Sequence, residues 1–139
     1  MNSISVTRTH FILYIKDQAR STAFYSQVLG CQPSLNVPGM TEFTFSENSV
    51  LGLMPETGIK RLLGDNFPDP GRSSGGPRCE IYLLVSDPLD FHHRAIQAGA
   101  VELSGLENRD WGQRAAYSLD PDGHVLAFAE QIEPEFESK

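Results

Sequence analysis

The alternation of apolar and polar residues predicts a strand and then a helix near the start of the chain. From His10 onward, Phe11, Leu13 and Ile15 point to one face, and the residues between them point to the other. Asp17 suits the N-cap of a helix whose buried side carries apolar residues at helical spacing. Gly30 suits the left-handed position that ends such a helix. The first thirty residues therefore predict one β-α unit.

The same pattern occurs a second time, beginning at Glu80. Apolar side chains alternate again, Asp87 suits an N-cap, Pro88 suits the first helical position, and Gly99 suits a helix stop. Seven residues separate His10 from Asp17, and seven separate Glu80 from Asp87. This shared register predicts an internal duplication.

Three short strands are predicted after each helix. They cover residues 32–37, 41–46 and 49–54 in the first half, and residues 101–104, 114–119 and 124–131 in the second. Asp120, Pro121 and Gly123 suit a type I turn before the last strand. The order βαβββ, found twice, predicts one α+β domain over residues 1–139. It consists of module one (8–56), a linker (57–78) in which residues 58–64 form a helical turn, module two (79–132) and a tail (133–139).

Composition and charge exclude several classes of partner. The 139 residues carry a formal net charge of -7, which argues against binding to nucleic acid or to a membrane surface. No apolar run is long enough to span a membrane, so we expect a cytoplasmic protein. Cys31 and Cys79 form no disulfide framework, and we expect both to be buried free thiols.

The two modules, with the stretches "HFILYIKDQARSTAFYSQVLG" and "WGQRAAYSLDPDGHVLAF", resemble the vicinal oxygen chelate superfamily. That superfamily includes glyoxalase I, extradiol dioxygenases and bleomycin-resistance proteins, and the resemblance covers residues 9–132. It implies that the eight strands form a cup-shaped, partly open mixed sheet with a divalent metal on its floor. It also implies a homodimer. Because this fold hosts unrelated reactions, the resemblance predicts the fold better than the reaction.

The resemblance implies four metal-binding positions, and only two of them carry a side chain that can bind a metal. They fall on His10 and Glu80 in the first strands, and on Gly52 and Ala127 in the last strands. A catalytic divalent site usually needs about three protein ligands. We therefore expect no bound metal. The alternative is Zn, Ni, Mn or Fe at His10 and Glu80, with a third ligand from Glu42, Glu56 or Glu130 if the strand register slips by one residue.

Other residues predict a binding surface for a small molecule. Trp111 is the only tryptophan, in a polar loop, and is either a stacking surface for a ligand or a hydrophobic plug on the rim. Arg114 is available for an anion or a cation–π contact. The strand alternation adds further wall residues to the predicted cup, namely Ile12, Tyr14, Met54, Tyr82 and Leu84. The acidic net charge favours a neutral or cationic ligand.

Three functions follow from these residues. The leading one is binding of a small organic molecule in a metal-free cup. The runner-up is a metal-dependent lyase, isomerase or dioxygenase in which His10 and Glu80 are catalytic, with the carboxylate orienting a general-base imidazole. The third is an interaction module without a ligand. His92 and His93, on the second helix, are expected at or near the surface and outside the site.

Overall fold

The computed structural model describes residues 6–73, 76–77 and 79–133, so that nearly all of the predicted tail lies outside the described residues. The element order is βαβββ twice, as predicted, and the chain is an α+β protein with two four-stranded mixed sheets. It divides into two compact units: the first covers residues 1–26 and 30–75, and the second covers residues 27–29 and 76–139. Each unit contains one of the sheets.

The first sheet has the strand order β1-β4-β3-β2, with β1 parallel to β4 and the other pairs antiparallel. Its strands are β1 (Thr9–Ile15), β2 (Leu35–Val37), β3 (Met40–Ser46) and β4 (Ser49–Pro55). The helix α1 (Gln18–Leu29) contacts one face of this sheet, where Tyr25 packs against Phe43 with ring centroids 6.4 Å apart. Both rings are almost fully buried. Burial of large aromatic rings between helix and sheet forms this part of the core.

The ends of α1 are where the sequence predicts them. The Asp17 carboxylate accepts a hydrogen bond from the backbone N–H of Arg20 at 3.1 Å. Gly30 adopts a φ of 72°, in the left-handed region, and its N–H donates to the Ser26 carbonyl. A side chain at Gly30 would be strained there, which is why glycine ends the helix.

The segment between the modules contains more regular structure than the predicted linker. The helix α2 (Glu56–Leu63) begins directly after β4, and a short 3-10 helix, η1 (Pro70–Arg72), follows. The Lys60 ammonium donates to the carbonyls of Gly64 at 2.9 Å and Phe67 at 2.6 Å, and so closes the turn after α2. The Phe67 ring packs edge-on against Tyr14 of β1.

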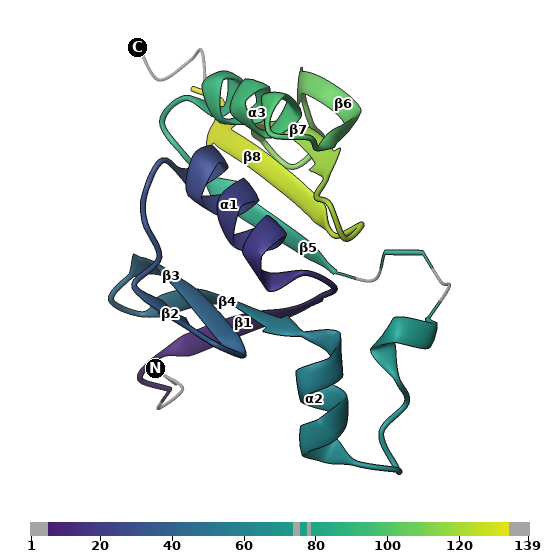
Figure 1. Ribbon diagram of the computed structural model, residues 1–139. Coiled ribbons are helices and arrows are strands. Elements are labelled where there is room, and N and C mark those ends of the chain that lie inside the picture. The colour runs from purple at the N-terminus through teal and green to yellow at the C-terminus, as the bar shows by residue number, and fades with distance from the viewer. Residues whose placement is uncertain (1–5, 74–75, 78, 134–139) are drawn as a thin grey trace. The chain divides into compact units, whose positions relative to one another are not determined.

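The second sheet repeats the first, with the strand order β5-β8-β7-β6. Its strands are β5 (Glu80–Leu84), β6 (Val101–Asn108), β7 (Gln113–Leu119) and β8 (Val125–Gln131). The helix α3 (Pro88–Gln97) lies across one face (Figure 1), where Phe91 packs against Phe128 with centroids 5.2 Å apart. The turn before β8 closes through a 2.9 Å bond from the Gly123 N–H to the Asp120 carbonyl. β6 is longer than predicted because its pairing with β7 continues past register shifts between Glu102 and Glu107.

Two expectations about individual side chains are wrong. His92 is buried rather than at the surface, because its side of α3 faces β6, where its Nε2 lies 2.8 Å from a Glu102 carboxylate oxygen. Cys31 and Cys79 are exposed rather than buried. Both cysteines lie just outside the regular elements, so that no helix covers them. In the part of the chain that the structure describes, no helix is long and apolar enough to cross a membrane.

Candidate functional site

Each sheet has one face that its helix covers and one face that the helix leaves uncovered. In the first sheet, Gln18 and Thr22 of α1 bond the Thr41 hydroxyl, so Thr41 points to the covered face. Its neighbour Glu42 therefore points to the opposite face, because successive side chains of a strand alternate. In the second sheet, Phe128 points toward α3, so Ala127 points away from it. We call these opposite sides the uncovered faces.

Equivalent rows of three residues cross the two uncovered faces. Ile12 of β1 pairs with Gly52 of β4, which pairs with Glu42 of β3. Tyr82 of β5 pairs with Ala127 of β8, which pairs with Tyr117 of β7. We call these the first row and the second row. Each has a small residue in the middle, at a position where the superfamily places a metal ligand.

Beside the second row, Trp111 is held in place by a chain of hydrogen bonds. Its indole N–H donates to the Tyr82 hydroxyl at 2.9 Å, and that hydroxyl donates to the Gln113 side-chain carbonyl. The Trp111 side chain is nevertheless 57% exposed. We call Trp111, Tyr82 and Gln113 the Trp111 cluster. It presents a large aromatic surface to solvent in a defined orientation.

Two polar groups near the second row are left without hydrogen bonds to any other described residue, namely the Tyr117 hydroxyl and the Glu80 carboxylate. Burial raises the pKa of Tyr117, and the nearby Glu80 and Tyr82 raise it further, while Arg109 acts in the opposite direction. Tyr117 is therefore a neutral phenol at physiological pH. The uncovered face thus offers one donor and one acceptor to a bound molecule.

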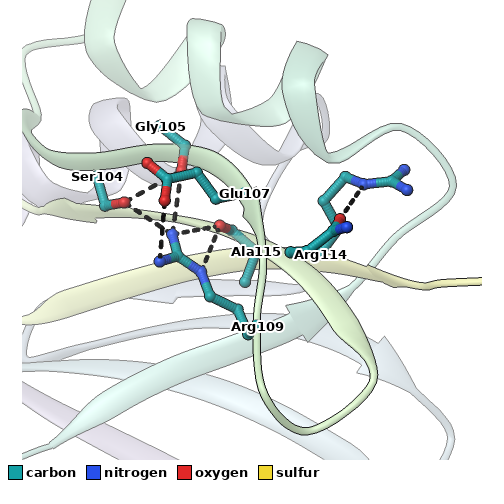
Figure 2. Close-up of polar contacts among 7 residues, drawn as sticks. Ser104, Gly105, Glu107, Arg109, Arg114 and Ala115 are labelled. Carbon is teal, nitrogen blue, oxygen red and sulfur yellow. Dashed lines mark hydrogen bonds and ion pairs between the residues drawn. The ribbon is translucent and has the colours of Figure 1, made fainter.

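Arg109 is a site residue that the sequence analysis missed. Its guanidinium group donates to the Ser104 hydroxyl at 2.7 Å, to the Gly105 carbonyl at 3.1 Å, and twice to the Ala115 carbonyl, at 2.7 and 3.2 Å (Figure 2). Its central carbon also lies 5.1 Å from the centroid of the Tyr117 ring. The sequence signal was an arginine inside a short polar hairpin loop, where backbone carbonyls turn inward and need donors.

The structure does not bring Arg114 to the Trp111 cluster. Arg114 follows Gln113 on β7, so its side chain starts from the opposite face of the sheet. It forms an ion pair with Glu130 at 2.9 Å and donates to the Asn108 side chain at 3.1 Å. Figure 2 shows it pointing away from Arg109. Its predicted role in ligand binding stays a prediction.

In the first module, the uncovered face brings His10 and Glu42 together. The His10 Nδ1 lies 3.6 Å from a Glu42 carboxylate oxygen, with both side chains partly exposed. The sequence pattern suggests Glu42 as a site residue only if the strand register slips by one residue. No slip is needed, because β1 and β3 are separated by β4 and the ordinary alternation places both residues on this face. The predicted wall residues Tyr14 and Met54 pair with each other on the same face.

Gly52 leaves a space that Ile12 fills. A Cβ atom built on Gly52 would lie 2.6 Å from the Ile12 Cδ1 and 3.4 Å from the Met40 sulfur. The first row is therefore closed over its middle position by its own neighbours. The close packing of Ile12 against Gly52 is typical of an apolar surface and not of a gap left by a lost ligand.

The residues present do not fit the metal site that the superfamily implies. Gly52 is covered by Ile12, and Ala127 presents a fully buried methyl group between Tyr82 and Tyr117. Among the described residues, no group of three His, Cys, Asp or Glu side chains gathers as a metal site. His10 and Glu80 lie on β1 and β5, in different units, and their predicted pairing and catalytic role stay predictions.

A separate groove of about 660 Å³ lies in the first unit, between α1 and β2. No charged side chain lines it, and it opens on the side of the sheet that α1 covers. The Gln18 side chain at its base is fully used: it donates to the Val37 carbonyl and the Thr41 hydroxyl, and it accepts from the Gly39 N–H. The groove is therefore distinct from both rows.

Comparisons with known proteins agree with this architecture. An uncharacterized protein of Mycobacterium tuberculosis is 27% identical over 127 residues, covering 86% of this chain and 72% of its own. A glyoxalase-related enzyme from Fulvimarina pelagi superposes with a TM-score of 0.75 at 21% identity, over 88% of this chain and 86% of that chain. A glyoxalase/bleomycin resistance protein/dioxygenase family enzyme from Burkholderia phytofirmans gives 0.74 at 20% identity, over 88% and 97%. At these identities the two structures establish the fold alone.

The family itself is established by a model that matches most of the chain. The match runs from residue 7 to residue 128, and so includes the whole first sheet, the second sheet as far as the middle of β8, and both rows. The chain belongs to the Glyoxalase/Bleomycin resistance protein/Dioxygenase superfamily.

Proposed function

We propose that the protein binds a small, flat organic molecule, neutral or cationic, on the uncovered face of the second sheet, without a metal. One observation carries this proposal. Trp111 exposes 57% of its side chain while its indole N–H is fixed by Tyr82. An exposed aromatic ring that is already ordered loses little conformational entropy when a ligand stacks on it.

The second row suits the rest of such a ligand. Ala127, between the two tyrosines, is small and fully buried, so the partly buried aromatic rings on either side of it form the surface. The neutral phenol of Tyr117 offers a donor, and the Glu80 carboxylate offers an acceptor that favours a cation or an N–H group. The protein's formal net charge of -7 acts in the same direction.

The superfamily's cup also implies ligand contacts on the first module and a second copy of the chain. We keep Ile12, Tyr14 and Met54 as proposed apolar contacts of the first module, and a homodimer as the proposed assembly. Arg114 is left out of the proposed surface, because its side chain starts from the opposite face of β7 and already forms a 2.9 Å ion pair with Glu130. It therefore serves as a control.

Fluorescence of the single tryptophan tests the proposal directly. The protein is titrated with quinoline, the N-methylquinolinium cation and a quinoline carboxylate, which share a ring system and differ in charge. We expect saturable quenching by the neutral and cationic compounds, and weaker binding of the anion. By calorimetry, Trp111→Ala should weaken binding about three- to tenfold, the loss of one stacking contact. Equal, non-saturating quenching by all three compounds would contradict the proposal.

One observation favours the enzyme alternative. His10 and Glu42, 3.6 Å apart, supply an imidazole and a carboxylate on one surface of the first module. Elemental analysis of untagged protein, after dialysis against Zn²⁺, Ni²⁺, Mn²⁺ or Fe²⁺, separates the two functions. We expect no retained metal and no turnover of the methylglyoxal–glutathione adduct. About one ion per chain, lost in His10→Ala, would replace the metal-free binder with a metal-dependent enzyme.

A further inference from the structure

The hairpin that carries Trp111 is tied to the sheet at its base. The hairpin is the segment 109–112 between β6 and β7. The Arg109 N–H donates to the Gln113 carbonyl at 2.8 Å, and the Gly112 N–H donates to the Arg109 carbonyl at 3.3 Å. From β8, the Ile132 N–H donates to the Gly112 carbonyl at 3.1 Å. These bonds fix the backbone on both sides of Trp111.

The side chain of Arg109 spans the irregular part of the β6–β7 pairing. Register shifts occur between Ser104 and Glu107, where a regular ladder would otherwise satisfy the carbonyls. The guanidinium group bonds Ser104 and Gly105 on β6 and Ala115 on β7, and so joins the two strands at this irregularity. A planar group with five donors can satisfy these acceptors together, whereas an ammonium group on the same stem cannot reach all of them.

The Arg109 guanidinium group also lies close to the proposed ligand site. Its plane lies near the Tyr117 ring of the second row, with 5.1 Å between its carbon and the ring centroid. Glu107, its only carboxylate partner among the described residues, is 3.8 Å away and largely exposed, so that this ion pair holds it weakly. Arg109 thus supports both aromatic residues that border the surface, Trp111 through the backbone and Tyr117 through its ring.

We propose that Arg109 is a positioning residue of the ligand site, which acts through Trp111 and Tyr117 and does not itself contact the ligand. This inference rests on the proposed function for its meaning, but its structural part can be tested without a ligand. Removing the guanidinium leaves the backbone bonds of the hairpin but loosens the β6–β7 pairing at its base, so the indole is held less firmly even though Tyr82 and Gln113 are unchanged.

The test compares Arg109→Lys with Arg114→Lys. Both variants keep the positive charge, one at the start of the hairpin and one on β7 just after it. In ¹⁵N NMR spectra the single indole N–H gives one resonance. In Arg109→Lys we expect its hydrogen exchange to become about tenfold faster and its acrylamide quenching to increase. Affinity for N-methylquinolinium should fall about twofold, less than in Trp111→Ala, because the indole is still present. In Arg114→Lys all three readouts should stay at the wild-type value. An unchanged indole in Arg109→Lys overturns the inference.

Ser104→Ala provides a milder variant if Arg109→Lys folds poorly. It removes the 2.7 Å acceptor of Arg109 and the 3.2 Å bond from the Ser104 hydroxyl to the Gly105 carbonyl, and it leaves the backbone bonds. We therefore expect a smaller change of the same sign in indole exchange, with little change in the far-ultraviolet circular dichroism. The two proposals fail separately. A changed indole without any dye binding refutes the proposed function and retains Arg109 as the positioning residue. Dye binding with an unchanged indole refutes only the role of Arg109.

Discussion

The two modules have the same strand order and pairing, yet their equivalent rows carry different chemistry. The first row reads Ile12, Gly52, Glu42, and the second reads Tyr82, Ala127, Tyr117. In the first, an aliphatic side chain folds over a glycine, and a carboxylate reaches toward an imidazole. In the second, two aromatic rings flank a methyl group.

The same backbone architecture therefore carries a closely packed aliphatic row in one module and an aromatic row in the other. The first row closes on itself, because Ile12 occupies the space above Gly52. In the second row Ala127 is fully buried, but the tyrosine rings on either side of it are only partly buried and the adjacent Trp111 faces solvent. Backbone pairing is shared by the two modules, so the side chains alone distinguish the two faces, and the aromatic face is the one proposed for ligand binding.

The packing of the first row is tested by Gly52→Ala. The new methyl group would lie 2.6 Å from Ile12 Cδ1. That atom is the far end of a flexible side chain that is 37% exposed, so it can move aside and the overpacking costs only about 1 kcal/mol. The lower entropy of the unfolded alanine chain returns about 0.4–1 kcal/mol. We therefore expect a net change within about 0.5 kcal/mol in the free energy of unfolding, measured by urea denaturation.

The double variant Ile12→Val, Gly52→Ala is the control for this prediction. Valine lacks the Cδ1 atom, so the collision disappears and Gly52→Ala should stabilise that background by about 0.4–1 kcal/mol. An equal effect in both backgrounds would show that Ile12 does not fill the space, and the contrast between the two rows would lose its basis.

The fold could be predicted because its signals are local. Asp17 and Gly30 bound α1 and Asp87 caps α3, and each of these residues acts through bonds to residues nearby in sequence. The length of β6 could not be predicted in the same way. Its second half pairs with β7 across an irregularity that the Arg109 side chain spans.

The site was predicted only where alternation along a single strand was enough. Alternation placed Ile12 and Tyr14 on one face, and Tyr82 on another. It could not pair His10 with Glu42, because that contact crosses β4 and needs the glycine in the middle. It also could not distinguish Arg109 from Arg114, since both lie beside Trp111 in sequence and only the hairpin geometry sends them to different partners.

The largest effect that separates the modules is expected from removing one hydroxyl group in each. Tyr82→Phe loses the bonds to Trp111 and Gln113, whose polar groups can be rehydrated, so we expect a loss of about 0.5–1.5 kcal/mol. Tyr14→Phe keeps its edge-on contact with Phe67, and its hydroxyl has no bond to another described residue, so we expect no measurable change. Urea denaturation followed by circular dichroism serves both variants. Equal losses would erase the distinction between the modules.

The smallest effect at neutral pH, and the most specific, is expected from Tyr117→Phe. Burial, Glu80 and Tyr82 raise the pKa of this phenol above its ordinary value of 10.0 in the folded protein. When pH rises past that value, the unfolded chain loses the proton first, so the stability that the neutral phenol contributes is fully present below about pH 10 and is lost as pH rises through the folded pKa. Ultraviolet titration of the four tyrosines should therefore lose a late step in Tyr117→Phe. Glu80→Gln should shift that step to lower pH, because it removes the carboxylate that opposes the phenolate. A late step that persists unchanged in Tyr117→Phe would belong to another tyrosine. A late step that does not move in Glu80→Gln would mean that Glu80 does not face Tyr117 across the second row. The polar end of the proposed ligand surface would then have to lie elsewhere.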